Sequence, residues 1–70
     1  MKELESKDAI EFWEYFTEKH SALRKKFPVS VGPNVINGSI IIFKPANMTI
    51  EDYKKYETIR NQWLSDKGFI

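Results

Sequence analysis

The chain has no cysteine, so it contains no disulfide and no thiolate metal site. Histidine occurs once, at His20, and the acidic residues show no metal-ligand spacing, so we predict no metal and no cofactor. The longest apolar run, Ile40–Phe43, is far shorter than the roughly 20 residues that span a bilayer. The charged start, residues 1–8, has no apolar signal region, so we expect a cytoplasmic protein without membrane contact.

An excess of charge of one sign is also missing. Eleven Lys and Arg residues face ten Asp and Glu residues, and the net charge of +1 argues against bulk duplex DNA as a partner. No glycine-rich phosphate loop occurs. The single histidine lies on an apolar helix face, where a structural role is more common than catalysis. We therefore predict a protein that is not an enzyme and has no catalytic residues.

The composition that remains is that of one small globular domain. Seventy residues with 41% hydrophobic and 30% charged side chains predict a single α+β domain over residues 1–70. Lysine outnumbers arginine and isoleucine is frequent, which is typical of an AT-rich coding source, so a bacterial or phage protein is one expectation.

A first helix is predicted from about Lys7 to Lys26. Its apolar residues fall within an arc of about 100°, the width of a core-facing side. Ser6 or Asp8 is the expected N-cap, and Pro28 is expected to end the helix. The predicted core of this helix comprises Phe12, Trp13, Phe16, Leu23 and Phe27.

A β-hairpin follows. Asn37-Gly38 between apolar runs is typical of a type I′ turn, which pairs Ile36 with Ser39 and Val35 with Ile40. Residues 29–31 and 34–36 are predicted to be extended. Alternation then places one apolar set on each face of the hairpin: Val31, Val35, Ile40 and Ile42 on the first, and Ile36, Ile41 and Phe43 on the second. A second helix, a second copy of the chain or a partner must cover the second face.

The second helix is predicted from about Ile50 to Asp66, with Thr49 as its cap and Gly68 just past its end. The resulting fold is α+β in the order α-β-β-α, with the hairpin packed against two helices. Tyr53, Tyr56, Arg60 and Trp63 lie on one side of this helix. Such residues are typical of binding hot spots, and equally of core packing with Arg60 reaching solvent; both interpretations stay open.

Two functions from different classes follow. The first is a small non-enzymatic regulator or inhibitor that binds another protein, or assembles into a homo-oligomer, through the second helix and the hairpin. Its predicted contact residues are Tyr53, Tyr56, Arg60, Trp63, Ile41 and Phe43.

The alternative is a nucleic-acid-binding protein that uses the basic end of the first helix. That cluster comprises Lys19, Arg24, Lys25 and Lys26, and Lys44, Lys54 and Lys55 would extend it if the fold brings them together.

Overall fold

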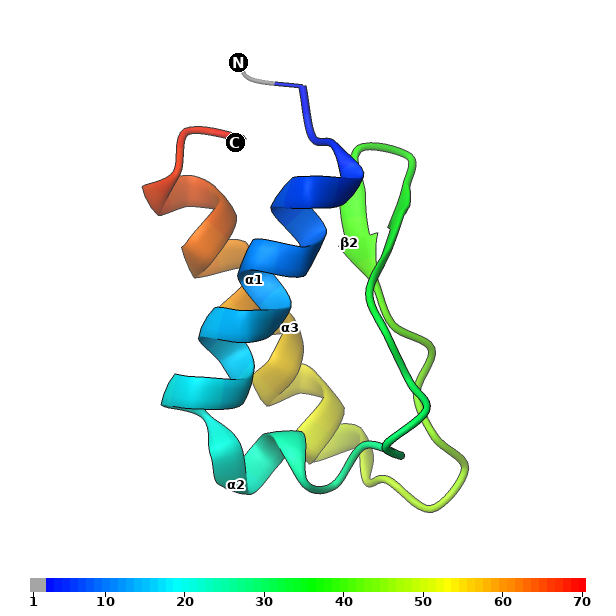
Figure 1. Cartoon of the computed structure of the whole chain (residues 1–70). Coiled ribbons are helices and arrows are strands. Elements are labelled where there is room, and N and C mark those ends of the chain that lie inside the picture. Colours follow the sequence, from blue (N-terminus) through cyan, green and yellow to red (C-terminus); the bar gives the residue numbers. More distant parts are fainter. Residues whose placement is uncertain (1–2) are drawn as a thin grey trace.

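Helices and one short hairpin make up the chain, which confirms the α+β class. The computed structural model describes residues 3–70 (Figure 1). In chain order its elements are α1 (Ser6–Lys19), α2 (Ser21–Arg24), β1 (Asn34–Ile36), β2 (Ser39–Ile41) and α3 (Ile50–Asp66). The order is thus α-α-β-β-α, and it differs from the predicted order only because the first helix is divided.

The division falls at His20, so the predicted continuous helix over residues 7–26 is wrong. His20 has φ −130° and ψ 47°, outside the helical region, and its N–H donates to the Phe16 carbonyl to end α1. The turn that follows carries Phe27 back against Phe16 and Tyr56, with ring centroids 6.1 and 5.6 Å apart. Periodicity identifies the residues that face the core, but it does not show whether the helix axis stays straight.

The start of α1 also differs from the prediction. The N-cap is Glu5, and neither Ser6 nor Asp8 holds that position. Asp8 instead lies in the first turn, where its carboxylate accepts a hydrogen bond of 2.9 Å from the Glu5 N–H. This contact satisfies one of the backbone donors that a helix start leaves unpaired.

The hairpin has the predicted register and turn. β1 and β2 are antiparallel, with Asn34 opposite Ile41, Val35 opposite Ile40, and Ile36 opposite Ser39. Asn37 and Gly38 have φ values of 51° and 74°, as a type I′ turn requires. The predicted strand at residues 29–31 is wrong, because the Val31 N–H donates to the Pro28 carbonyl in a turn.

The bounds of α3 match the prediction. The Thr49 hydroxyl accepts from the Asp52 N–H at 3.1 Å, which confirms Thr49 as the N-cap. At the other end Gly68 has φ 84°, and the Phe69 N–H donates to the Leu64 carbonyl. This is a Schellman termination, which requires a residue in the left-handed region. It also folds Phe69 back against Trp63, with stacked rings 6.0 Å apart.

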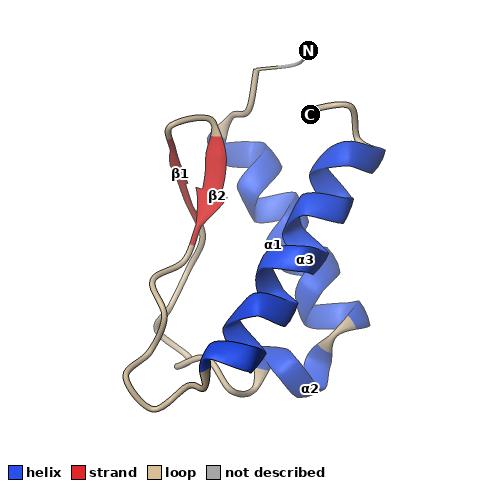
Figure 2. Cartoon of the chain, turned by 180° about the vertical axis from the view of Figure 1, so that it is seen from behind, coloured by secondary structure: helices blue, strands red, loops and turns tan. Residues whose placement is uncertain are grey.

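The core lies between α1, α3 and one face of the hairpin. α1 and α3 run side by side, and the hairpin flanks both of them (Figures 1 and 2). Phe12, Phe16 and Phe27 are buried as predicted, whereas Trp13 and Leu23 are only half-buried at the core edge. None of the helices in residues 3–70 is long and apolar enough to cross a membrane.

Candidate partner-binding surface

The four residues of α3 that the sequence marks for partner binding face the protein itself. Tyr56 has no exposed surface, Trp63 and Arg60 are 6% and 9% exposed, and Tyr53 is half-buried. Trp63 packs on Phe12 of α1, with ring centroids 5.4 Å apart. Core packing is therefore the role of this side of the helix, and Tyr56, Arg60 and Trp63 are withdrawn from any surface that a partner could reach.

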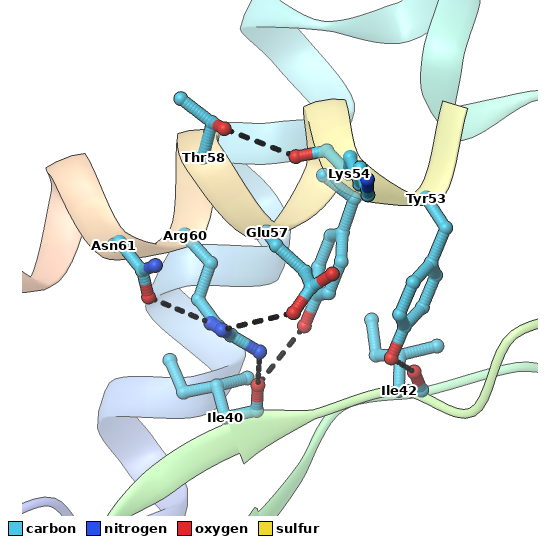
Figure 3. Close-up of polar contacts among 9 residues, drawn as sticks. Ile40, Ile42, Tyr53, Lys54, Glu57, Thr58, Arg60 and Asn61 are labelled. Carbon is cyan, nitrogen blue, oxygen red and sulfur yellow. Dashed lines mark hydrogen bonds and ion pairs between the residues drawn. The ribbon is translucent and has the colours of Figure 1, made fainter. Parts of the chain in front are cut away.

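Three of these residues donate hydrogen bonds to backbone carbonyls in β2 and just beyond its end, and Figure 3 labels two of them, Tyr53 and Arg60. The Tyr56 hydroxyl donates to the Ile40 carbonyl at 3.0 Å, and the Arg60 guanidinium donates to the same oxygen at 3.4 Å. The Tyr53 hydroxyl donates to the Ile42 carbonyl at 2.8 Å. We call Tyr53, Tyr56 and Arg60 the edge clamp, because they occupy the carbonyl of Ile40 in β2 and that of Ile42 just after it, on the side that faces away from β1.

The edge clamp also explains how a charged side chain is accommodated in the core. The Arg60 Nε donates to the Asn61 side chain at 3.2 Å, and the Glu57 carboxylate lies 3.8 Å from the guanidinium. The guanidinium carbon lies 5.6 Å from the centre of the Tyr56 ring. Burial raises the pKa of the Tyr56 hydroxyl to about 12, and the nearby guanidinium only partly opposes this shift. Tyr56 is therefore a neutral hydrogen-bond donor at physiological pH.

The opposite face of the hairpin stays open. Phe43 is 74% exposed, Ile36 is 40% exposed and Ile41 is half-buried, whereas Ile40 and Ile42 of the inner face are buried. The predicted division of the hairpin into two apolar faces is thus confirmed. Neither α1 nor α3 covers the face that carries Ile36 and Phe43, because both helices pack on the face that carries Ile40 and Ile42.

A groove lies between the start of α1 and β1. Its volume is about 560 Å³, and we call it the hairpin groove. It is lined by Ser6, Ala9, Ile10, Pro33, Asn34, Val35, Ile36 and Phe43. None of these side chains is charged, although 30% of the residues in the chain are. Ile10, at 56% exposure, continues the apolar surface from the hairpin onto α1. Nothing in the periodicity of α1 indicated that Ile10 would meet the hairpin, since that contact depends on the packing of distant segments.

A second groove, of about 640 Å³, lies between the α1–α2 joint and α3. Lys19, His20, Lys54 and Lys55 lie along it, with Leu23 and Ile59 among its apolar residues, and we call it the lysine groove. The fold therefore brings part of the predicted basic cluster together. Its lining contains no Phe, Tyr or Trp that could stack on a base.

The remaining basic residues have other surroundings. Arg24 lies over the Trp13 ring at 4.6 Å and donates to the Phe27 carbonyl at 3.3 Å. Lys26 pairs with Asp52 at 2.8 Å, and this hydrogen bond lowers the pKa of the Asp52 carboxyl. Lys25 is exposed, and Lys44 donates to the Pro45 carbonyl away from both grooves.

Comparison with known proteins adds no assignment, since no family model, curated protein or solved structure matches this chain. Among residues 3–70, no group of three or more His, Asp or Glu side chains is placed to hold a metal ion.

Proposed function

We propose that this chain is a small non-enzymatic domain that binds another protein through the hairpin groove and the open face beside it. The observation that supports the proposal is an apolar surface that continues across two elements, formed by Ile10, Ile36 and Phe43 around a groove without charged side chains. Single exposed apolar residues are ordinary, but a contiguous patch is typical of an interaction site. We also propose a regulator or inhibitor role in the cytoplasm.

In this proposal α3 does not contact the partner but supports the hairpin that does. Tyr53, Tyr56 and Arg60 hold β2, and the buried Trp63 packs α3 on α1. This arrangement fixes the hairpin against the helices, so the open face is presented on a rigid base. A rigid surface loses less conformational entropy when it binds.

Paired substitutions test this proposal. Phe43→Lys and Ile10→Lys each place a charge in the hairpin groove. Because both side chains are exposed, we expect these substitutions to leave the packing of the core unchanged. Val29→Lys is the matched control, because Val29 is 94% exposed and does not line the groove. We expect both groove variants to weaken partner capture from a lysate of the source cells by about 1 kcal/mol or more, and the control to retain it. Quantitative mass spectrometry gives the ratios.

Circular dichroism and melting curves establish that all three variants are folded. Capture that persists undiminished in both groove variants would place the interface elsewhere on the molecule. Capture lost equally in the Val29→Lys control would show that added charge, rather than the groove, is responsible.

Nucleic-acid binding through the lysine groove is the second candidate. It is favoured by the gathering of Lys19, Lys54 and Lys55 from distant segments around one groove. It ranks second because Arg24 and Lys26 already have partners inside the protein and the lining of the groove contains no Phe, Tyr or Trp for stacking.

A further inference from the structure

The two outer edges of the hairpin differ. In an antiparallel pair, residues that exchange both backbone hydrogen bonds alternate with residues that exchange none. Ile36 and Ser39 flank the two-residue turn as an exchanging pair, so Val35 and Ile40 form the next, non-exchanging pair. Their N–H and C=O groups therefore point outward. The contacts that the Ile40 carbonyl makes with Tyr56 and Arg60 agree with this direction.

Only one of these edges is covered. The edge clamp from α3 occupies the carbonyl of Ile40 in β2 and that of Ile42 just after the strand. Along β1, no described residue outside the hairpin is hydrogen-bonded to the backbone of Val35. β1 lies beside α1, and β2 is the strand whose backbone α3 reaches. A strand that joins this sheet must therefore add to β1.

Proteins normally protect such an edge with charged side chains. Here every residue from 27 to 43 is uncharged, and Lys26 and Lys44 lie just outside that stretch. The hairpin groove runs beside β1, with Ser6, Ala9 and Ile10 of α1 as its other wall. A strand edge without charged side chains, next to an apolar wall, is suited to an extended peptide. The peptide backbone can hydrogen-bond to the strand edge while alternate side chains contact the wall.

We propose that the hairpin groove binds an extended, uncharged segment of a partner protein as a third strand, hydrogen-bonded to the backbone of Val35. This inference rests on the proposed function and specifies the partner's conformation. The segment carries apolar residues at alternate positions, which contact Ile10 on the α1 side and Phe43 on the hairpin side. A single strand fits here better than a second copy of the chain, because the copy would bring its own α1 against the wall formed by Ser6 and Ile10.

Selection from a random eight-residue peptide library displayed on phage, with the full chain as target, provides the probe. We expect enriched peptides to alternate apolar and small polar residues and to lack charge and proline. In the complex, hydrogen exchange of the Val35 amide should slow. The Ile36 amide, already bonded within the hairpin, is the internal control and should change little.

Two N-methylated versions of the best peptide separate strand addition from other modes of binding. Only alternate N–H groups of an added strand face β1, so methylation of one alternating set should weaken binding about tenfold or more. Methylation of the other set should leave the affinity within about threefold, because those groups point to solvent. Equal losses for the two sets would overturn strand addition.

Protein variants then separate this inference from the proposed function. We expect Phe43→Lys to weaken peptide binding about fivefold or more and the Val29→Lys control to retain wild-type affinity. If Phe43→Lys loses peptide binding but the two N-methylated peptides lose affinity equally, the groove is still a binding site and only the addition of a third strand is overturned. Binding that is unchanged in Phe43→Lys would overturn both. Both would also be overturned if the selection gave helical or acidic peptides whose binding changes the amide hydrogen exchange of residues in the lysine groove. Sedimentation experiments test whether the chain forms a homodimer. A homodimer that dissociates in Phe43→Lys would show that the groove binds a second copy of the chain rather than a peptide.

Discussion

At the scale of single residues, the edge clamp is the most informative feature of this protein. Tyr53 and Tyr56 combine an aromatic ring with a hydroxyl, and Arg60 combines an aliphatic stem with a guanidinium; the same chemistry makes Tyr and Arg common at interfaces. Here the polar groups donate to the backbone carbonyls of Ile40 and Ile42 in the same chain. Among the described residues, no buried polar side-chain atom is left without a hydrogen-bond partner.

The raised pKa of Tyr56 predicts a loss of stability at high pH. Unfolded tyrosine ionises near pH 10, whereas burial raises the pKa of Tyr56 to about 12. The unfolded state therefore releases its proton first, and the contribution of Tyr56 falls as the pH rises from 10 to 12. Two pKa units correspond to an upper limit of roughly 2–3 kcal/mol.

Urea unfolding of wild type and Tyr56→Phe at several pH values between about 8 and 12 measures this contribution. At pH 8 we expect Tyr56→Phe to be less stable by about 1 kcal/mol, because the Ile40 carbonyl loses one donor. Its stability should then fall less than that of wild type above pH 10. Tyr15→Phe is the control, since Tyr15 lies outside the edge clamp. The stability of this variant should fall above pH 10 as steeply as that of wild type, because Tyr56 is still present. An equally steep drop in Tyr56→Phe would assign the titration to other groups.

At the scale of elements, the hairpin is determined by its turn and by its support. A two-stranded ribbon is at best marginally stable in water. In this protein the side chains of Ile40 and Ile42 are buried against the helices, and the edge clamp binds the backbone carbonyls of the same two residues. The positive φ values of Asn37 and Gly38 set the register that places these isoleucines inward.

Substitution of the turn glycine tests the role of backbone conformation without a packing change. Gly38 has φ 74°, and an added Cβ would meet nothing within 4 Å. We therefore expect Gly38→Ala to destabilise the protein by about 1–2 kcal/mol through strain alone. Gly32→Ala is the matched control, since Gly32 is equally open but lacks positive φ. It should be neutral or stabilising by less than about 1 kcal/mol. Thermal melts of both variants compare the two effects, and a neutral Gly38→Ala would show that the turn does not require the left-handed region.

At the scale of the whole molecule, charge is divided unevenly. The helices carry most of the charged residues, whereas residues 27–43 carry none. Basic side chains gather in part around the lysine groove, but Lys26 is paired with Asp52 at 2.8 Å, the shortest ion pair among the described residues. The hairpin and the lining of the hairpin groove therefore carry no charged side chain.

The same distribution predicts little affinity for nucleic acids. We expect duplex and single-stranded probes of about 20 nucleotides not to be retarded by micromolar protein in gels at about 200 mM salt. Any complex at about 50 mM salt should be weakened by Lys54→Gln/Lys55→Gln but not by Phe43→Lys. Tight binding that persists at the higher salt would make the second candidate function the better one.

Local features of the fold were predictable because their causes are local. The turn at Asn37-Gly38, the register of the hairpin and the bounds of α3 follow from residues close together in sequence. The end of α1 was not predictable in this way. The bend at His20 depends on Phe27 meeting Phe16 and Tyr56, which is a contact between distant segments.

The candidate site shows the same limit. Spacing by three or four residues determined that Tyr56, Arg60 and Trp63 would line one side of α3, and alternation determined that Ile42 and Phe43 would lie on opposite faces of the hairpin. Only the tertiary structure decided which of these surfaces is covered. α1 and α3 bury one hairpin face, and α3 closes the β2 edge. Within residues 3–70, no element covers the open face, and no hydrogen bond occupies the outward backbone groups of Val35.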